Sequence, residues 1–259
     1  FCALSRREIG IDAEELDRNV NLALAEKILS PNEKAQFDAA PDKRRALLTF
    51  WVLKEAQVKR TGEGLRGYPN KTDFSLDDPR VTEMDGCLVA VIDTHAHMDD
   101  RAFDTDRETL LSALPEQGIG LLMNPGCSLT SSRAASALAS RYDYIYAAVG
   151  SHPDAADEVN DVTLEEYRTL CKLNPKIRAI GEIGLDYHYE DIPRERQQAA
   201  FRAQMALALE LNLPVIVHER EAHEDGIRIV EEFPEVTGVF HCYSGSAEMA
   251  KWLIARGWY

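Results

Sequence analysis

Residues 87–100 read CLVAVIDTHAHMDD, a run of six apolar residues that is followed by Asp93, His95 and His97. The run has the length and the apolar composition of a strand that is buried on both faces. Two histidines that are two residues apart point to the same side of an extended chain, as shared binding of a metal ion requires. This stretch therefore predicts a buried strand with a pair of metal ligands at its carboxyl end.

The same texture repeats downstream, where short apolar runs alternate with longer segments of helical spacing. The runs expected to form strands are 87–92, 119–123, 144–149, 177–183, 213–217 and 237–240. The segments expected to form helices are 104–114, 131–140, 164–173, 194–211, 222–233 and 247–256. A strand followed by a helix, six times over, predicts an α/β fold with a parallel sheet and right-handed crossovers.

Five of the seven histidines closely follow one of these runs, and Glu182 ends the fourth run. These histidines are His95, His97, His152, His218 and His241. In a parallel barrel the carboxyl ends of the strands meet at one mouth, so side chains distant in sequence come together there. One histidine beside a strand is more often a hydrogen-bonded core or loop residue, but the repeated placement favours a metal site. Imidazole and carboxylate ligands suit Zn, Mn, Fe or Mg, and a shared carboxylate can bridge two ions.

Five stretches of this second part resemble the TatD-type metal-dependent hydrolases, which are TIM barrels of the amidohydrolase-like class. They are VIDTHAHMDD at 91–100, AVGSHPD at 148–154, AIGEIGLDYH at 179–188, PVIVHER at 214–220 and VFHCYSG at 239–245. The resemblance implies a phosphodiesterase, typically a DNase with exonuclease character, and two divalent ions such as Mg, Mn or Zn. It implies His95 and His97 on one ion, Glu182 as a bridging and catalytic residue, and His218 with His241 on the second ion. His152 and Arg220 would lie beside the substrate phosphate.

Two departures from the family pattern bear on activity. Asp154 stands where the family usually has a second histidine after His152. The family's last ligand is an aspartate on the eighth strand, whereas this chain runs through six βα units and ends at Tyr259. The expected fold is thus an incomplete (β/α)8 barrel with open sheet edges, and the isolated chain is expected to be inactive or nearly so.

The first part of the chain carries a separate set of carboxylates and lysines. Asp12 and Glu14 are expected on one face of a short strand, and Trp51 to Lys59 on a helix that brings Glu55 next to Lys59. A further helix is expected to start with Ser30 as its N-cap and Pro31 at its first position. Three carboxylates brought together suit Mg²⁺, lysines suit a pyrophosphate, and a glutamate can take a proton from a hydroxyl.

Three stretches of this part resemble the Sfp-type 4'-phosphopantetheinyl transferases, namely IGIDAEELDR at 9–18, ILSPNEKAQF at 28–37 and TFWVLKEAQVKRTGEGL at 49–65. The resemblance implies an α+β half-domain that uses Mg²⁺ and coenzyme A and acts on an acyl or peptidyl carrier protein. It implies Mg²⁺ ligands at Asp12, Glu14 and Glu55, with Glu55 and Lys59 catalytic and Lys54 near the coenzyme A phosphates. Because only the second half of such an enzyme is matched, transferase activity is expected to be absent.

The charge balance and the pattern of apolar and amphipathic runs change together near residue 91. Residues 1–91 carry 14 Lys and Arg against 16 Asp and Glu, whereas residues 92–259 carry 15 against 28. We expect a transferase-like half-domain at 1–90 and a hydrolase barrel at 91–259, with the strand at 87–92 belonging to the barrel alone. The pairing of two such parts is typical either of a natural fusion or of a reading frame that runs across two neighbouring genes.

The formal charge of −15 argues against a protein that wraps nucleic acid by charge alone, since that needs an excess of Lys and Arg. Five cysteines without CxxC spacing argue against a disulfide framework or a zinc ribbon. No apolar run approaches the length that spans a bilayer and no leader is evident, so we expect a cytoplasmic protein without a membrane partner. Two alternatives stay open: another amidohydrolase-type ester or amide hydrolase, and a non-catalytic module that binds carrier proteins.

Overall fold

The computed structural model describes residues 9–61, 73–78, 81–84, 87–117, 119–189 and 191–259, with the side chains of 9–13, 57–61, 82, 84 and 87–92 left out. The chain divides into two compact units. The first comprises residues 1–94 and 106–122, and the second comprises residues 95–105 and 123–259. Each unit is described by itself below. None of the helices among the described residues is long and apolar enough to cross a membrane.

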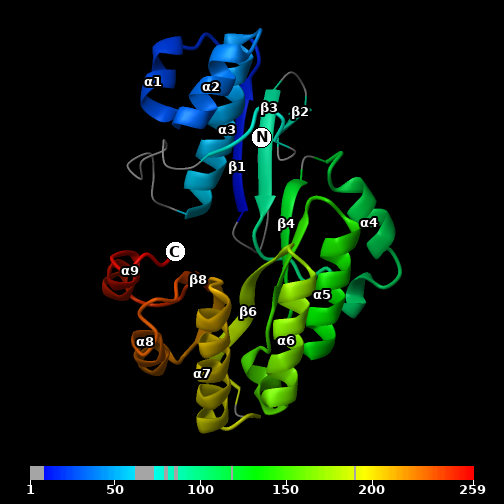
Figure 1. Cartoon of the computed structure of the whole chain (residues 1–259), viewed down its shortest axis with the longest axis vertical. Coiled ribbons are helices and arrows are strands. Elements are labelled where there is room, and N and C mark those ends of the chain that lie inside the picture. The colour runs from blue at the N-terminus through cyan, green and yellow to red at the C-terminus, as the bar shows by residue number, and fades with distance from the viewer. Residues whose placement is uncertain (1–8, 62–72, 79–80, 85–86, 118, 190) are drawn as a thin grey trace. The chain divides into compact units, whose positions relative to one another are not determined.

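The first unit contains both helices and strands (Figure 1). Its strands are β1 (Ile9–Glu15), β2 (Val81–Met84), β3 (Cys87–Asp93) and the start of β4 (Ile119–Pro125). Its helices are η1 (Leu22–Leu24), α1 (Ala25–Ile28), α2 (Pro31–Ala39), α3 (Lys43–Thr61) and α4 (Arg107–Ala113). The expected strand at Asp12 and Glu14 and the expected helix from Trp51 to Lys59 are thus both present.

Helix α2 begins as the sequence predicts. The Ser30 side chain accepts a hydrogen bond from the Glu33 backbone N–H at 3.1 Å, and the Glu33 carboxylate accepts one from the Ser30 N–H at 2.8 Å. Pro31 occupies the first turn, where its missing N–H costs nothing. This capping box satisfies two of the N–H groups that a helix start leaves open. Beneath it, Phe50, Val52 and Leu53 of α3 are fully buried in the unit's core.

Strand β3 has partners of two kinds. It pairs antiparallel with β1 from Ile9 against Asp93 to Glu15 against Cys87, and antiparallel with β2. Its last residues, Val91 to Asp93, pair in parallel with the start of β4. Our assignment of this strand to the barrel alone is therefore wrong. One strand serves both sets because β1 occupies one edge, while β2 and β4 share the other edge at opposite ends.

The second unit is a run of parallel strands, each followed by a helix. From the end of β4 its strands are β5 (Ile145–Val149), β6 (Ile177–Asp186), β7 (Val215–Arg220) and β8 (Gly238–His241). They are hydrogen-bonded in sequence order. The helices are η4 (Arg101–Phe103), α5 (Leu129–Arg141), η5 (Pro153–Glu158), α6 (Asp161–Leu173), α7 (Arg194–Leu211), α8 (His223–Glu231) and α9 (Ala247–Ile254). All six predicted strand and helix pairs are present across β3 to α9, which confirms the incomplete barrel.

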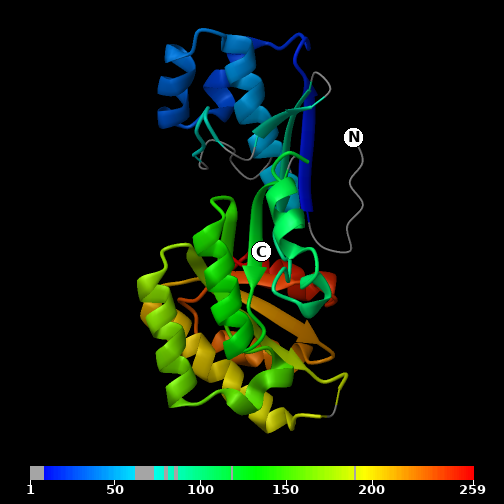
Figure 2. The same cartoon turned by 90° about the vertical axis from the view of Figure 1, so that its right-hand side faces the viewer.

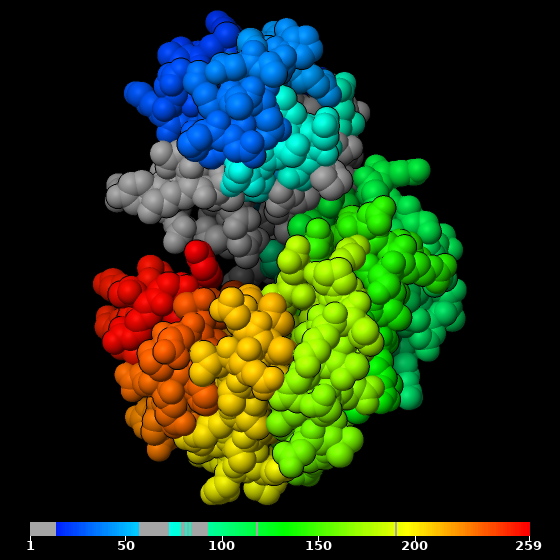
Figure 3. All heavy atoms as spheres, in the orientation of Figure 1, coloured from blue at the N-terminus to red at the C-terminus, as the bar shows by residue number. Residues whose placement is uncertain are grey.

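Helices α5, α6 and α7 lie side by side along one face of these strands (Figures 1 and 2). They begin at capping side chains or a proline: Ser128 caps α5, Asn160 caps α6, and Pro193 precedes α7. In the space-filling view, helices α5 to α8 form a continuous outer surface of the unit (Figure 3). Strand β6 is buried on both faces, as its nearly continuous apolar sequence requires. Its carboxyl end thus lies inside the unit.

Candidate metal centre

The histidines and the glutamate predicted as metal ligands come together in the second unit. His95 and His97 lie just after β3, His218 is in β7, and His241 is the last residue of β8. Glu182 lies inside β6, which continues to Asp186 and so extends beyond the end that the sequence predicted. The parallel register places His218 opposite Gly184 on one side and opposite His241 on the other. Parallel pairing is therefore what gathers these side chains.

Glu182 is the centre of the cluster. Its Oε2 atom lies 3.0 Å from His95 Nε2 and 3.4 Å from His97 Nε2, while its Oε1 atom lies 3.2 Å from His218 Nδ1. Burial acts to raise the pKa of this carboxyl, but the hydrogen bonds from His218, His95 and His97 outweigh it. They hold the pKa of Glu182 well below its usual range. Glu182 thus carries a negative charge that three imidazoles surround.

His241 completes the group from the side of β8. Its ring stacks on that of His95, with 3.5 Å between the centroids and 13° between the planes. One ligand atom each of His95, Glu182 and His241 lie within 4.8 Å of one another. Burial, followed by the charge of His95, lowers the pKa of His241 to about 4. His241 is therefore neutral near pH 7 and able to offer a lone pair.

Asp186 is a member of this cluster that the sequence analysis missed. Its Oδ2 atom lies 3.0 Å from His218 Nε2, and its Oδ1 atom accepts a hydrogen bond from the His188 N–H. Asp186 also falls within 4.8 Å of His152 and His218 as a potential ligand group. A sequence signal was available, because Asp186 is four residues after Glu182 and so lies on the same face of an extended strand.

Cys127 is the second missed member. It lies two residues after the end of β4, close to a strand end as the histidines are. Its Sγ atom lies 3.5 Å from His97 Nδ1, and it groups with His97 and Glu182 within 4.8 Å. Burial, with the nearby charges of Glu182 and Asp99, raises the pKa of the Cys127 thiol. The absence of CxxC spacing hid this residue, because its partners come from other strands.

His152 and Arg220 were predicted beside the substrate phosphate. The His152 ring meets that of His218 edge to face at 4.3 Å, so His152 lies at the cluster. Its Nδ1 atom contacts the carboxylate of Asp154 at 2.8 Å, and this hydrogen bond holds the pKa of Asp154 below its usual range. Arg220 ends β7, and its guanidinium lies over the Tyr189 ring at 5.4 Å. The role of both residues at a phosphate stays a prediction.

Two close approaches of the backbone shape the centre. Gly126 accepts the Glu182 N–H at 2.7 Å, and a Cβ there would lie 2.3 Å from the Ser132 hydroxyl. Gly184 has a φ of +141°, and a Cβ there would lie 1.9 Å from the carbonyl oxygen of His218. Since neither position has room for a side chain, both glycines are needed for β6 to carry Glu182 into the cluster.

A chain of hydrogen bonds holds the loop that carries His95 and His97. The buried Asn124 accepts from the Met98 N–H at 2.6 Å and donates to Asp99 at 2.7 Å. The other oxygen of Asp99 accepts from the Ser131 hydroxyl, which also accepts the Cys127 N–H at 3.0 Å. This chain ties the loop after β3 to the loop after β4, so His97 and Cys127 are positioned together.

The predicted transferase residues are only partly within the described side chains. Those of Asp12 and Lys59 lie outside them. Glu14 in β1 is half-buried and forms an ion pair with Arg18, and Glu55 in α3 is half-buried as well. Helix α3 packs against β1, so the elements that carry Glu14 and Glu55 are neighbours. A shared Mg²⁺ site stays a prediction.

Lys54 is a buried lysine and not a surface one. It is 3% exposed, and its Nζ atom lies 2.8 Å from the carboxylate of the fully buried Glu33. Burial lowers the pKa of Lys54, although Glu33 acts against that shift. Glu33 also accepts the Phe74 N–H at 3.0 Å, so the pair joins α2, α3 and residues 73–76. A role of Lys54 near the coenzyme A phosphates stays a prediction.

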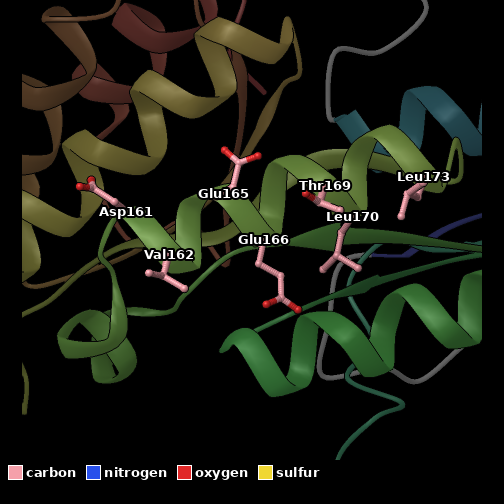
Figure 4. A pocket seen from close by; sticks show the side chains of 7 residues that line it. All are labelled: Asp161, Val162, Glu165, Glu166, Thr169, Leu170 and Leu173. Atoms are coloured by element: carbon pink, nitrogen blue, oxygen red, sulfur yellow. The ribbon is translucent and has the colours of Figure 1, made fainter.

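A surface hollow of about 680 Å³ lies elsewhere in the second unit (Figure 4). It is lined by one helix alone, with Val162, Leu170 and Leu173 beside Asp161, Glu165 and Glu166. No member of the histidine cluster lines it. The convergence of side chains at the strand ends, and not this hollow, therefore defines the candidate site.

The donor set of the cluster fits two divalent ions. Neutral imidazoles and a carboxylate are ligands for Zn, Mn and Fe, and the two oxygens of Glu182 face different histidines, as a bridging ligand requires. A parallel βα array with such a donor set at its strand ends has the fold of a TIM barrel of the metal-dependent hydrolase type. The model of the TatD-related DNase family matches residues 92–259, and the chain belongs to that family.

The first part matches a second family. The model of the 4'-phosphopantetheinyl transferase superfamily matches residues 8–104, so the two matches overlap at 92–104. The two-part architecture that the sequence predicted is thereby confirmed.

Relatives of known sequence and structure match the second part. The uncharacterized metal-dependent hydrolase YabD of Bacillus subtilis is 37% identical over 65% of this chain and 67% of its own length. The 3'-5' ssDNA/RNA exonuclease TatD of Escherichia fergusonii is 33% identical over 65% of each chain. The crystal structure of YjjV, a TatD homologue from Escherichia coli, has a TM-score of 0.59 and 35% identity, and the match covers 64% of this chain and 65% of that one. The chain thus spans about two thirds of these relatives.

Proposed function

We propose that the second part of the chain is a metal-dependent phosphodiesterase centre that acts on DNA or a related nucleic-acid strand. The observation that carries this proposal is the Glu182 carboxylate, whose two oxygens contact His95, His97 and His218 at 3.0–3.4 Å. The name of the Escherichia fergusonii relative, an exonuclease of single-stranded DNA and RNA, supports the substrate class. A cytoplasmic location is part of the same proposal.

In this proposal His95 and His97 would hold one ion, His218 and His241 would hold the second, and Glu182 would be shared between them. Two such ions, when bound, activate a water molecule and neutralise the charge of the phosphodiester. Asp186 contacts His218 Nε2 and thereby directs His218 Nδ1 toward Glu182. His152 and Arg220 bind the substrate phosphate by hydrogen bonds and charge. Because the chain is acidic overall, such groups have to be supplied at the centre itself.

Metal binding by the chain itself is the first test. The chelator-treated protein is titrated with Mn²⁺ and Zn²⁺ by calorimetry, alongside Glu182→Gln. Two sites are expected in the parent protein, and the variant should lose at least about tenfold in affinity at both because the shared charge is gone. Glu166→Gln is the matched control, since Glu166 forms an exposed ion pair with Arg133 outside the cluster. Equal binding by Glu182→Gln and the parent would refute the proposal.

Cleavage is the second test. Single-stranded DNA, RNA and a simple phosphodiester are offered to the chain and to a form extended by two further βα units, with and without chelator. Chelator-sensitive cleavage of the oligonucleotides by the extended form is expected. Cleavage of simple carboxylic esters or amides alone would favour the other amidohydrolase-type chemistry.

We propose that residues 1–90 are a remnant of a Mg²⁺-dependent phosphopantetheinyl transferase, whose complete form would use coenzyme A as cosubstrate and an acyl or peptidyl carrier protein as partner. The family match and the packing of α3 on β1, which makes neighbours of the elements bearing Glu14 and Glu55, support it. Calorimetry with coenzyme A and Mg²⁺ tests the expectation that this part is a remnant. Binding with a micromolar dissociation constant would contradict that expectation.

A further inference from the structure

Two glutamines of helix α7 bind the backbone at the carboxyl ends of β5 and β6. The Gln197 side chain accepts the Asp186 N–H at 2.8 Å and donates to the Asp186 carbonyl at 2.9 Å. The Gln204 side chain binds Ser151 in the same way, with its N–H at 2.7 Å and its carbonyl at 3.1 Å. An amide can do this because it carries an acceptor and donors on one planar group. Each glutamine therefore fixes both backbone groups of one residue.

The two bound residues lie where β5 and β6 no longer pair with each other. Ile180 is the last residue of β6 that pairs with β5, and both Ser151 and Asp186 come after that pairing. Because both residues are buried, their backbone groups need other partners. The buried side chains of Gln197 and Gln204 are seven residues apart, so they lie on one face of α7, about 10 Å from each other. One helix thus sets the positions of both strand ends.

The segments that α7 holds supply two neighbours of His218 in the candidate metal centre. Asp186 Oδ2 lies 3.0 Å from His218 Nε2, and Asp186 Oδ1 accepts the His188 N–H. His152 directly follows Ser151, and its ring meets that of His218 edge to face at 4.3 Å. A shift of either strand end would therefore move a group that touches His218.

We propose that Gln197 and Gln204 are positioning residues of the centre with separate tasks. Gln197 holds Asp186 against His218 Nε2, which leaves His218 Nδ1 to a metal ion. Gln204 holds the backbone that presents His152 to a substrate phosphate. The inference rests on the proposed function and identifies the helix that sets the geometry of that site. Loss of Gln197 should therefore act on metal binding, and loss of Gln204 on phosphate binding.

Calorimetry of the full chain separates the two tasks. Gln197→Met should weaken one of the two Mn²⁺ sites by about tenfold, as the loss of an outer partner of a metal ligand does, and leave the other within about twofold. Gln204→Met should leave both Mn²⁺ sites within about twofold. It should weaken the binding of inorganic phosphate to the Mn²⁺-loaded protein by at least about fivefold.

Gln198→Met is the matched control. Gln198 lies on the same helix, but its amide binds the side chains of Tyr187 and Asp225 and not the backbone of a strand end. It should change neither kind of binding. Gln197→Glu and Gln204→Glu keep the volume and the acceptor but lose the donor, so they should reproduce the same division of effects. They replace the methionine variants if circular dichroism shows that those do not fold.

The division of effects is a readout that loss of packing would not produce. Equal weakening of metal and phosphate binding by both variants would mean that the glutamines only support the fold, which contradicts the proposal. Binding that stays as in Gln198→Met overturns it as well. Failure of the parent protein to bind Mn²⁺ or phosphate would instead refute the proposed function.

Discussion

The two oxygens of Glu182 face different histidines, and this division decides how the centre is organised. Oε2 contacts His95 and His97 from the loop after β3, while Oε1 contacts His218 from β7. A carboxylate that is 3% exposed needs compensation, and three imidazoles supply it. Replacement of any one of them alters the partners of the others, so single substitutions at this centre should be non-additive.

At the residue scale, His241 should make the metal-free protein sensitive to acid. Its pKa is lowered to about 4, so between the usual value of 6.5 and 4 the unfolded chain takes up the proton first. The contribution of His241 to the free energy of unfolding is therefore fully present above about pH 6.5 and is lost as pH is lowered through this window. The loss is at most about 3 kcal/mol because His241 is partly exposed. Urea unfolding of the chelator-treated protein from pH 7.5 to 4.5 measures this loss.

His241→Gln should reduce the pH dependence in that window. The contribution of His218 to stability depends on pH in the opposite direction. Burial acts to lower the pKa of His218, but the Glu182 and Asp186 carboxylates outweigh it and raise that pKa. Its contribution is present at low pH and is lost as pH rises through the raised pKa. His218→Gln should accordingly steepen the acid loss. The same pH profile in both variants would contradict the assignment.

At the scale of elements, the Glu33–Lys54 pair connects α2 to α3 inside the first unit. Lys54→Met leaves the Glu33 carboxylate buried without its ammonium partner, although the Ser30 and Phe74 N–H groups still bind it. We expect a loss of about 3–5 kcal/mol in the free energy of unfolding. Denaturant unfolding followed by circular dichroism measures it.

The double variant Glu33→Gln with Lys54→Met removes both charges and should be less destabilised than the sum of the single variants. Arg45→Met is a suitable control, since Arg45 pairs with Glu83 at an exposed position and such pairs contribute about 0–1 kcal/mol. A change below about 1 kcal/mol for Lys54→Met would show that the buried pair is not structural.

At the scale of the whole molecule, the net charge of residues 92–259 limits how nucleic acid can bind. With 15 Lys and Arg against 28 Asp and Glu, few phosphates can be neutralised by side chains. The dissociation constant for a single-stranded oligonucleotide, measured by fluorescence anisotropy with Mn²⁺ present, should depend weakly on salt. When the logarithm of the association constant is plotted against that of the salt concentration, a slope of about −1 is expected, because each neutralised phosphate contributes about −0.7. A slope steeper than about −4 would indicate a basic groove and contradict this mode.

Periodicity alone determined the βα architecture, because the burial of a parallel strand and the amphipathic spacing of its helix are written locally in sequence. The capping box at Ser30 is equally local. The placement of His95, His97, His218 and His241 at or near strand ends, and of Glu182 in the second half of its strand, was visible for the same reason. Strand ends in a parallel array meet without any further information.

Contacts between distant segments were decided only by the tertiary structure. Strand β3 pairs with β1, β2 and β4 because its two edges accept different partners, which a single apolar run does not reveal. Lys54 of α3 can be buried because its ammonium group pairs with the carboxylate of Glu33 in α2. Asp186 and Cys127 join the centre because β6 extends past Glu182 and the loop after β4 folds onto His97. Sequence spacing reports the face of one element, whereas a metal centre depends on the distances between several.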